Sequence, residues 1–150
     1  MKTKLILSLV FILMLACGDS EKKDTPEKSI AEKEVTDWAR PGAQGKMSGA
    51  YFTYRNQLSV ADTLISVQSN SAMMTQVHES YTTDDGLAGM REINQIIIRP
   101  KESLVLQKGG IHVMLMSLKE ALANGDSITV ELNFAQAGVV ELKMPVLSSN

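Results

Sequence analysis

Residues 127–134 read SITVELNF, and this stretch decides the fold class. Its apolar residues alternate with Ser, Thr, Glu and Asn along the whole stretch; they are Ile128, Val130, Leu132 and Phe134. Strict alternation over eight residues is the period of a strand that buries one face and leaves the other in solvent. The stretch therefore predicts a half-buried β-strand within a sheet.

Outward from this strand, nine further stretches have a strand-like pattern. They cover residues 36–40, 49–55, 62–68, 75–80, 89–93, 95–98, 103–107, 112–117 and 139–146. Turn residues separate them, for example Asp84-Asp85-Gly86 and Lys108-Gly109-Gly110. Only Leu118–Ala123 (LKEALA) is expected to be helical, for one or two turns. Many short strands at regular spacing predict an all-β fold, either a sandwich or a Greek-key barrel.

The amino terminus has the pattern of an export signal. Residues 1–4 (MKTK) are basic, and residues 5–15 (LILSLVFILML) form an apolar run that is too short to span a bilayer, which needs about 20 residues. The run ends in Met14-Leu15-Ala16-Cys17-Gly18, which resembles the lipobox of bacterial lipoproteins. We expect residues 1–16 to be a signal peptide and Cys17 to be lipidated. The alternative is an ordinary signal peptide followed by an incidental cysteine.

The next segment, residues 17–35, is expected to be a tether. Nearly all of it is polar or charged, so it cannot bury enough apolar area to offset its ordering entropy. Acyl chains on Cys17 would hold the protein on a membrane, facing the periplasm or the cell exterior. The folded domain is expected over residues 36–150.

Charge and cysteine count exclude several classes of function. The formal net charge is −2 and there is no basic cluster, which argues against a nucleic-acid binder. One cysteine cannot form an intrachain disulfide, a CxxC pair or a Cys-rich zinc site. If Cys17 is acylated, no thiolate remains for thiol catalysis or for a blue-copper centre. No Gly-x-Ser-x-Gly elbow is present either, so we do not expect an enzyme.

The functional signal lies in two histidines and several methionines. Thioethers are soft ligands that suit Cu(I) and bind zinc, magnesium or calcium poorly. His112 and Met114 begin a predicted strand and share one face, because residues two apart in a strand point the same way. His78 ends another strand, and Met90 begins the next one across the Asp84–Gly86 turn. Two such pairs at one end of a sandwich would make a His2Met2 site for one Cu(I) ion.

The other methionines of the predicted domain are interpreted as packing residues, since a methionine in a strand usually fills a core. Met116 and Met144 belong to predicted strands, and Met73 and Met74 precede one. An accessory ligand role for Met73 is the alternative. Met47 is left without an assignment.

The His and Met spacing resembles that of the PCuAC family of periplasmic Cu(I) chaperones. Eleven residues separate His78 from Met90, twenty-one separate Met90 from His112, and one separates His112 from Met114. Five segments look like the family's: Trp38–Ala43, Gly49–Thr53, Met90–Ile93, Lys108–Met116 and Asn124–Asp126. The resemblance covers about residues 36–146. It implies a cupredoxin-like β-sandwich with one Cu(I) held near the surface by His78, Met90, His112 and Met114. The His78–Met90 interval is one residue longer than in many members, an insertion that a turn tolerates.

The resemblance also implies a function and partners. Members supply the CuA centre of cytochrome c oxidase, so the expected recipient is oxidase subunit II or a Sco-type assembly factor. Some members carry a His- and Met-rich tail for a second ion; residues 145–150 (PVLSSN) contain no His or Met, so a single site is expected. Copper buffering or tolerance is an alternative in the same chemistry. A copper enzyme or an electron carrier is disfavoured, because its copper site would need a thiolate or a third histidine. A metal-free β-sandwich that serves as a binding module of the envelope is the other alternative.

Overall fold

The computed structural model describes residues 37–148. The predicted signal peptide, the predicted lipidation site Cys17 and the predicted tether lie outside these residues. The described part of the chain contains strands and turns, and it has no helix that is long and apolar enough to cross a membrane. The strands are β1 (Trp38–Ala39), β2 (Ser48–Arg55), β3 (Asp62–Ser69), β4 (Ala72–Thr82), β5 (Ala88–Glu92), β6 (Ile96–Ile98), β7 (Ser103–Leu106), β8 (Ile111–Leu118), β9 (Ser127–Phe134) and β10 (Gly138–Pro145).

All ten predicted strands are confirmed, with ends that move by a few residues. The predicted helix at Leu118–Ala123 is wrong. Leu118 ends β8, and the backbone of Leu122 exchanges two hydrogen bonds with Gly42, of 2.8 and 3.0 Å. Six residues of good helix propensity cannot offset the cost of starting a helix when another segment offers bonds to the same backbone groups.

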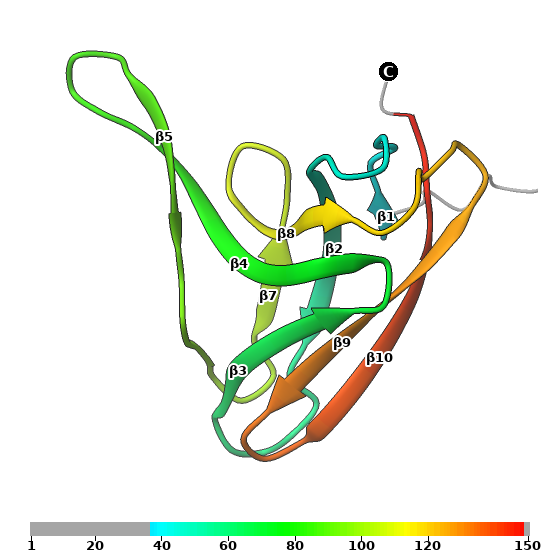
Figure 1. Cartoon of the computed structure of the whole chain (residues 1–150). Helices are drawn as coiled ribbons and strands as arrows, with labels where there is room; N and C mark the ends of the chain where they lie inside the picture. Colours follow the sequence, from blue (N-terminus) through cyan, green and yellow to red (C-terminus); the bar gives the residue numbers. More distant parts are fainter. Residues whose placement is uncertain (1–36, 149–150) are drawn as a thin grey trace, which may run out of the picture. The chain divides into compact units, whose positions relative to one another are not determined.

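The strands form two antiparallel sheets that pack face to face (Figure 1). The larger sheet has the order β1-β2-β8-β4-β5, with β7 also paired to β2, and the smaller one has the order β10-β9-β3-β6. The expected all-β sandwich is therefore confirmed. In Figure 1 the hairpin of β4 and β5 extends away from the two sheets. This hairpin carries one predicted histidine and one predicted methionine ligand.

The core lies between the inner faces of the two sheets. All four apolar residues of SITVELNF are buried in it, as the alternation predicts. The larger sheet contributes Val113 and Leu115 from β8 and Val77 from β4. Because neighbours in a strand point to opposite faces, the residues on either side of Val77 and Val113 face outward. This alternation places His78 and His112 on the outer face of the larger sheet.

Two buried polar side chains tie loops to the smaller sheet. The Asp62 carboxylate accepts backbone hydrogen bonds from Thr63 (2.7 Å), Gln136 (2.8 Å) and Ala137 (2.9 Å). Burial alone would raise the pKa of Asp62, but the three N–H donors outweigh it, and the pKa lies below its usual value. The Asn56 amide nitrogen lies 2.9 to 3.2 Å from three carbonyl oxygens. Both buried side chains therefore have hydrogen-bond partners.

Candidate metal site

The two histidines face each other across neighbouring strands. His78 on β4 is the register partner of His112 on β8, and their ring centroids are 6.4 Å apart. Directly opposed residues of an antiparallel pair project from the same face. The sequence placed these residues 34 positions apart, and the β4–β8 ladder brings them together.

The two predicted methionines reach the same region from different strands. Met90, Met114 and His112 line one open pocket of about 270 Å³ on the outer face of the larger sheet. Met90 lies on β5 opposite Ser80 and is 54% exposed, whereas Met114 is partly buried. His78 lies beside this pocket, next to His112, rather than lining it. The structure thus brings Met90, His112 and Met114 to one pocket and places His78 next to His112.

A backbone hydrogen bond orients the His112 ring. Its Nδ1 lies 3.0 Å from the carbonyl oxygen of Gly110, to which it donates. Because a neutral imidazole carries one proton, Nε2 then keeps its lone pair. Histidine ligands of metals are commonly oriented by a hydrogen bond of this kind at the other ring nitrogen. The Tyr51 ring packs on the other side, with centroids 6.3 Å apart.

The His78 ring has one nitrogen paired and one open. Nε2 lies 3.1 Å from the side-chain oxygen of Gln76, to which it donates. Nδ1 is buried and has no hydrogen-bond partner. A buried polar atom without a partner is rare in folded proteins and costs free energy. This open lone pair, beside a second imidazole and thioethers, suits a metal ligand.

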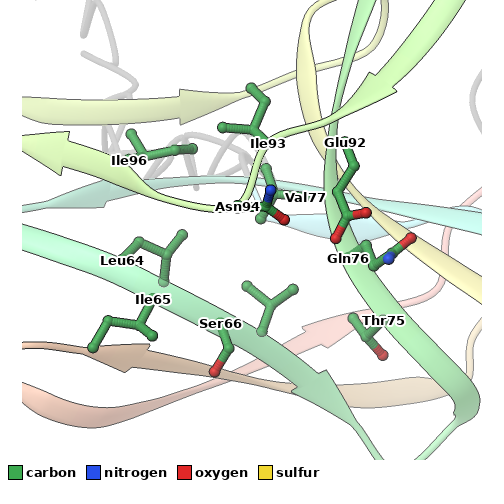
Figure 2. Close-up of a pocket in the computed structure, with 11 residues that line it drawn as sticks. Leu64, Ile65, Ser66, Thr75, Gln76, Val77, Glu92, Ile93, Asn94 and Ile96 are labelled. Atoms are coloured by element: carbon green, nitrogen blue, oxygen red, sulfur yellow. The ribbon is translucent and has the colours of Figure 1, made fainter.

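Gln76 was not predicted as a functional residue. It lies two residues before His78 on the same face of β4 and also lines a small pocket of about 100 Å³ between β3, β4 and the segment after β5 (Figure 2). Glu92, the register partner of His78, projects toward the same pocket. The sequence signal that could have identified Gln76 is its position two residues from a candidate ligand on the same predicted strand. A polar side chain at that spacing can orient an imidazole in a strand.

The other methionines of residues 37–148 divide into one core residue and four on the outside. Met144 is buried in the core, as predicted. The expectation that Met73 and Met74 fill the core is wrong, because they are 70% and 53% exposed. Met47 is 57% exposed and lines the same pocket as Met90, His112 and Met114. Met116 is partly buried on β8, two residues after Met114.

Hard ligands are not gathered in the same way. Within residues 37–148, no group of three or more His, Cys, Asp or Glu side chains is placed to hold a metal ion. The charged residues that line the pocket of Met90 and Met114 are Arg40 and Lys108. Glu79, close to the candidate ligands in sequence, instead pairs with Arg91 at 2.6 Å.

Sequence comparison assigns the family. A family model described as "Putative lipoprotein LpqE-like" matches residues 33–146. The chain belongs to this family. It is also 32% identical over 124 residues to "Putative lipoprotein Lxx21020" of Leifsonia xyli subsp. xyli, an alignment that covers 81% of this chain and 74% of that protein.

Structure comparison confirms the predicted fold. The copper-bound PCuAC domain from PmoF2 superposes with a TM-score of 0.60 at 22% identity, over 76% of this chain and 90% of that domain. The Cu(I) form of DR1885 from Deinococcus radiodurans superposes with a TM-score of 0.57 at 26% identity, over 83% and 86% of the two chains. The resemblance to the PCuAC family and the cupredoxin-like β-sandwich are thereby confirmed.

Proposed function

We propose that this protein is a lipid-anchored, extracytoplasmic Cu(I) carrier, and that it binds one ion through His78, His112, Met90 and Met114. The observation that carries the proposal is the buried, unpartnered Nδ1 of His78 directly beside His112. Nδ1 of His78 and Nε2 of His112 are the two nitrogens whose lone pairs remain available. The copper-bound states of the PmoF2 domain and of DR1885 support copper as the cargo.

The chemistry of the ligand set selects a soft ion. Two thioethers and two neutral imidazoles favour Cu(I) over magnesium or calcium, which need oxygen ligands. The pocket has Arg40 and Lys108 on its wall and no carboxylate among its lining residues. Such surroundings disfavour hard divalent cations, whose binding is mainly electrostatic. The affinity for a metal ion would therefore come from its bonds to polarisable sulfur and to imidazole nitrogen.

The exposure of the ligands suits transfer rather than storage. Met90 is half exposed on the β4–β5 hairpin, while His112 is buried. An incoming ligand from an acceptor can therefore replace the Met90 thioether first and the imidazoles later. Stepwise exchange keeps the ion coordinated throughout. We therefore favour a binding and carrier protein over an enzyme.

The sequence and the relatives support a lipid anchor and a destination for the ion. The lipobox-like segment ending in Cys17 and the lipoprotein description of the Leifsonia xyli relative support anchoring through Cys17. The family resemblance supports delivery toward the CuA centre of cytochrome c oxidase, through subunit II or a Sco-type factor. The alternative is that the protein buffers copper or provides copper tolerance without delivering the ion to a dedicated acceptor.

An anaerobic competition titration against a colorimetric Cu(I) chelator tests the proposal. The parent protein should withdraw one equivalent of Cu(I), and His112→Ala and Met114→Leu should each weaken binding by at least about tenfold. Met73→Leu is the matched control, because Met73 is exposed and lies outside the pocket. It should bind as the parent does.

The titration also distinguishes the metal-free alternative. If the parent withdraws no copper, the copper proposal is wrong, and a metal-free envelope binding module is the better account of this β-sandwich. If the parent and all three variants withdraw copper equally, the proposed ligands are wrong.

A further inference from the structure

The outer face of the larger sheet carries more thioethers than the His2Met2 site uses. Met74 on β4 is the register partner of Met116 on β8. On the other side of β8, Ser48 pairs with Leu115 and Gly49 with Met114. Extending this register by one residue places Met47, which directly precedes β2, opposite Met116. Met47, Met116 and Met74 thus form a methionine row over β4, β8 and the residue before β2.

The spacing of the row suits convergence on one ion. Neighbouring strands lie about 4.8 Å apart, and directly opposed residues have Cβ atoms about 4.5–5.5 Å apart. Met116 is in the middle, with Met47 and Met74 one strand away on either side. Methionine has three rotatable side-chain bonds, so the outer thioethers can swing toward the central one. All three residues are at least partly exposed, so they are accessible to an ion from solvent.

Met114 connects the row to the His2Met2 site. On β8, His112, Met114 and Met116 lie at alternate positions of one face, about 6.6 Å from one to the next. Met114 lines the pocket together with His112 and Met90, and Met47 of the row lines that pocket too. The two groups of ligands are therefore continuous.

We propose that the methionine row is a second, thioether-only binding position for a soft monovalent d10 ion such as Cu(I) or Ag(I). This inference rests on the proposed function, because it extends the path of the same cargo. With no imidazole or charged ligand, the row binds more weakly than the His2Met2 site. A weak position next to a tighter one gives the ion a place to land or leave while Met114 exchanges between the two.

The experiment is a titration of the full chain in detergent with Ag(I), which resists oxidation, read from the ¹³C-methyl signals of its methionines. The first equivalent should shift Met90 and Met114. A second equivalent should shift Met116 and Met74 and shift Met47 further. The double variant Met74→Leu/Met116→Leu should take up one equivalent instead of two and keep the response of Met90, because neither residue lines the pocket of the His2Met2 site. Leucine nearly preserves side-chain volume, so the fold is retained.

Two internal controls define the outcomes. Met144 is buried in the core and should not respond, whereas Met73 is exposed outside the row and reports non-specific binding to any accessible thioether. If Met74 and Met116 do not move, or if Met73 moves with them at the same Ag(I) concentration, the row is not a binding position, although the His2Met2 site stands. If Met90 and Met114 do not move either, the proposed function itself is wrong.

Discussion

The Asp62 side chain is buried, whereas His78 lies partly buried on the outer face of the larger sheet, and its Nδ1 is buried without a partner. The Asp62 carboxylate accepts three backbone hydrogen bonds and holds the β9–β10 turn against the start of β3. The His78 ring makes one hydrogen bond and leaves its buried Nδ1 without a partner. The hydrogen-bonding capacity of the buried Asp62 carboxylate is therefore met by backbone donors of the same chain. Under the proposed function, His78 keeps the lone pair of Nδ1 open for a metal ion, at a cost in the free energy of the metal-free fold.

The largest effect is expected when the open group is removed. His78→Leu should lower Cu(I) affinity by about 100-fold or more, because losing a ligand exceeds the roughly 10–100-fold loss typical of an orienting residue. The same change should leave the stability of the metal-free protein unchanged or raise it, since an unpartnered buried atom disappears. Chelator competition and urea unfolding measure the two effects. A loss of more than about 1 kcal/mol in the metal-free state would mean that Nδ1 has a structural partner.

Removing the satisfied group should give the opposite pattern. Asp62→Ala leaves the amides of Gln136 and Ala137 without their acceptor and should lower the free energy of unfolding by about 1–3 kcal/mol. Cu(I) affinity should stay at the parent value, because Asp62 is not among the residues that line the pocket of His112. Denaturant unfolding combined with the competition titration checks both statements. A large loss of copper affinity would show that the two regions are coupled.

A smaller effect is expected from the residue that orients His78. Gln76→Leu removes the acceptor of Nε2–H and frees the ring to adopt the other tautomer. Cu(I) binding should weaken by about tenfold, the lower end of the range for orienting partners. Gln76→Glu keeps an oxygen at the same place and should restore most of the affinity. Equal weakening by both variants would argue that Gln76 acts through packing in its pocket.

The smallest effect is the pH dependence that Asp62 gives to stability. Its pKa is lowered in the folded protein, so its contribution is complete above the unfolded-state pKa of about 3.9 and is lost as the pH falls toward the folded pKa. Between pH 7 and pH 3, the parent should therefore lose more stability than Asp62→Asn. Asp85→Asn is the control, since the pKa of that exposed carboxyl is lowered mainly by the Thr83 side chain and solvent screens it. Parallel curves for the parent and Asp62→Asn would contradict this assignment.

Much of the fold could be predicted because alternation in a strand is a local signal. SITVELNF showed which residues face the core, and turn residues marked where strands end. The helix predicted for residues 118–123 (LKEALA) is wrong because helix propensity depends on the local sequence alone. The hydrogen bonds between Leu122 and Gly42 join segments that are far apart in the chain. Tertiary hydrogen bonding overrides weak propensity in so short a segment.

The site was less predictable, because it depends on register across strands. The pairing of His78 with His112 and the approach of Met47 to Met114 require knowledge of which strands are neighbours. Spacing within one strand was sufficient to pair His112 with Met114, and the Asp84–Gly86 turn between two predicted strands suggested the pairing of His78 with Met90. The tautomers of the two imidazoles come from Gln76 and Gly110, which only the structure places beside them.

The most direct test is to determine which ring nitrogens bind the ion. Long-range ¹H–¹⁵N correlation spectra of the imidazoles, recorded without metal and with one equivalent of Cu(I), report the protonation and ligation of each nitrogen. We predict that copper shifts Nδ1 of His78 and Nε2 of His112, while the Nε2–H of His78 and the Nδ1–H of His112 remain protonated. Unchanged nitrogens at His78, or ligation through its Nε2, would contradict the central claim that its buried Nδ1 is held open for the metal.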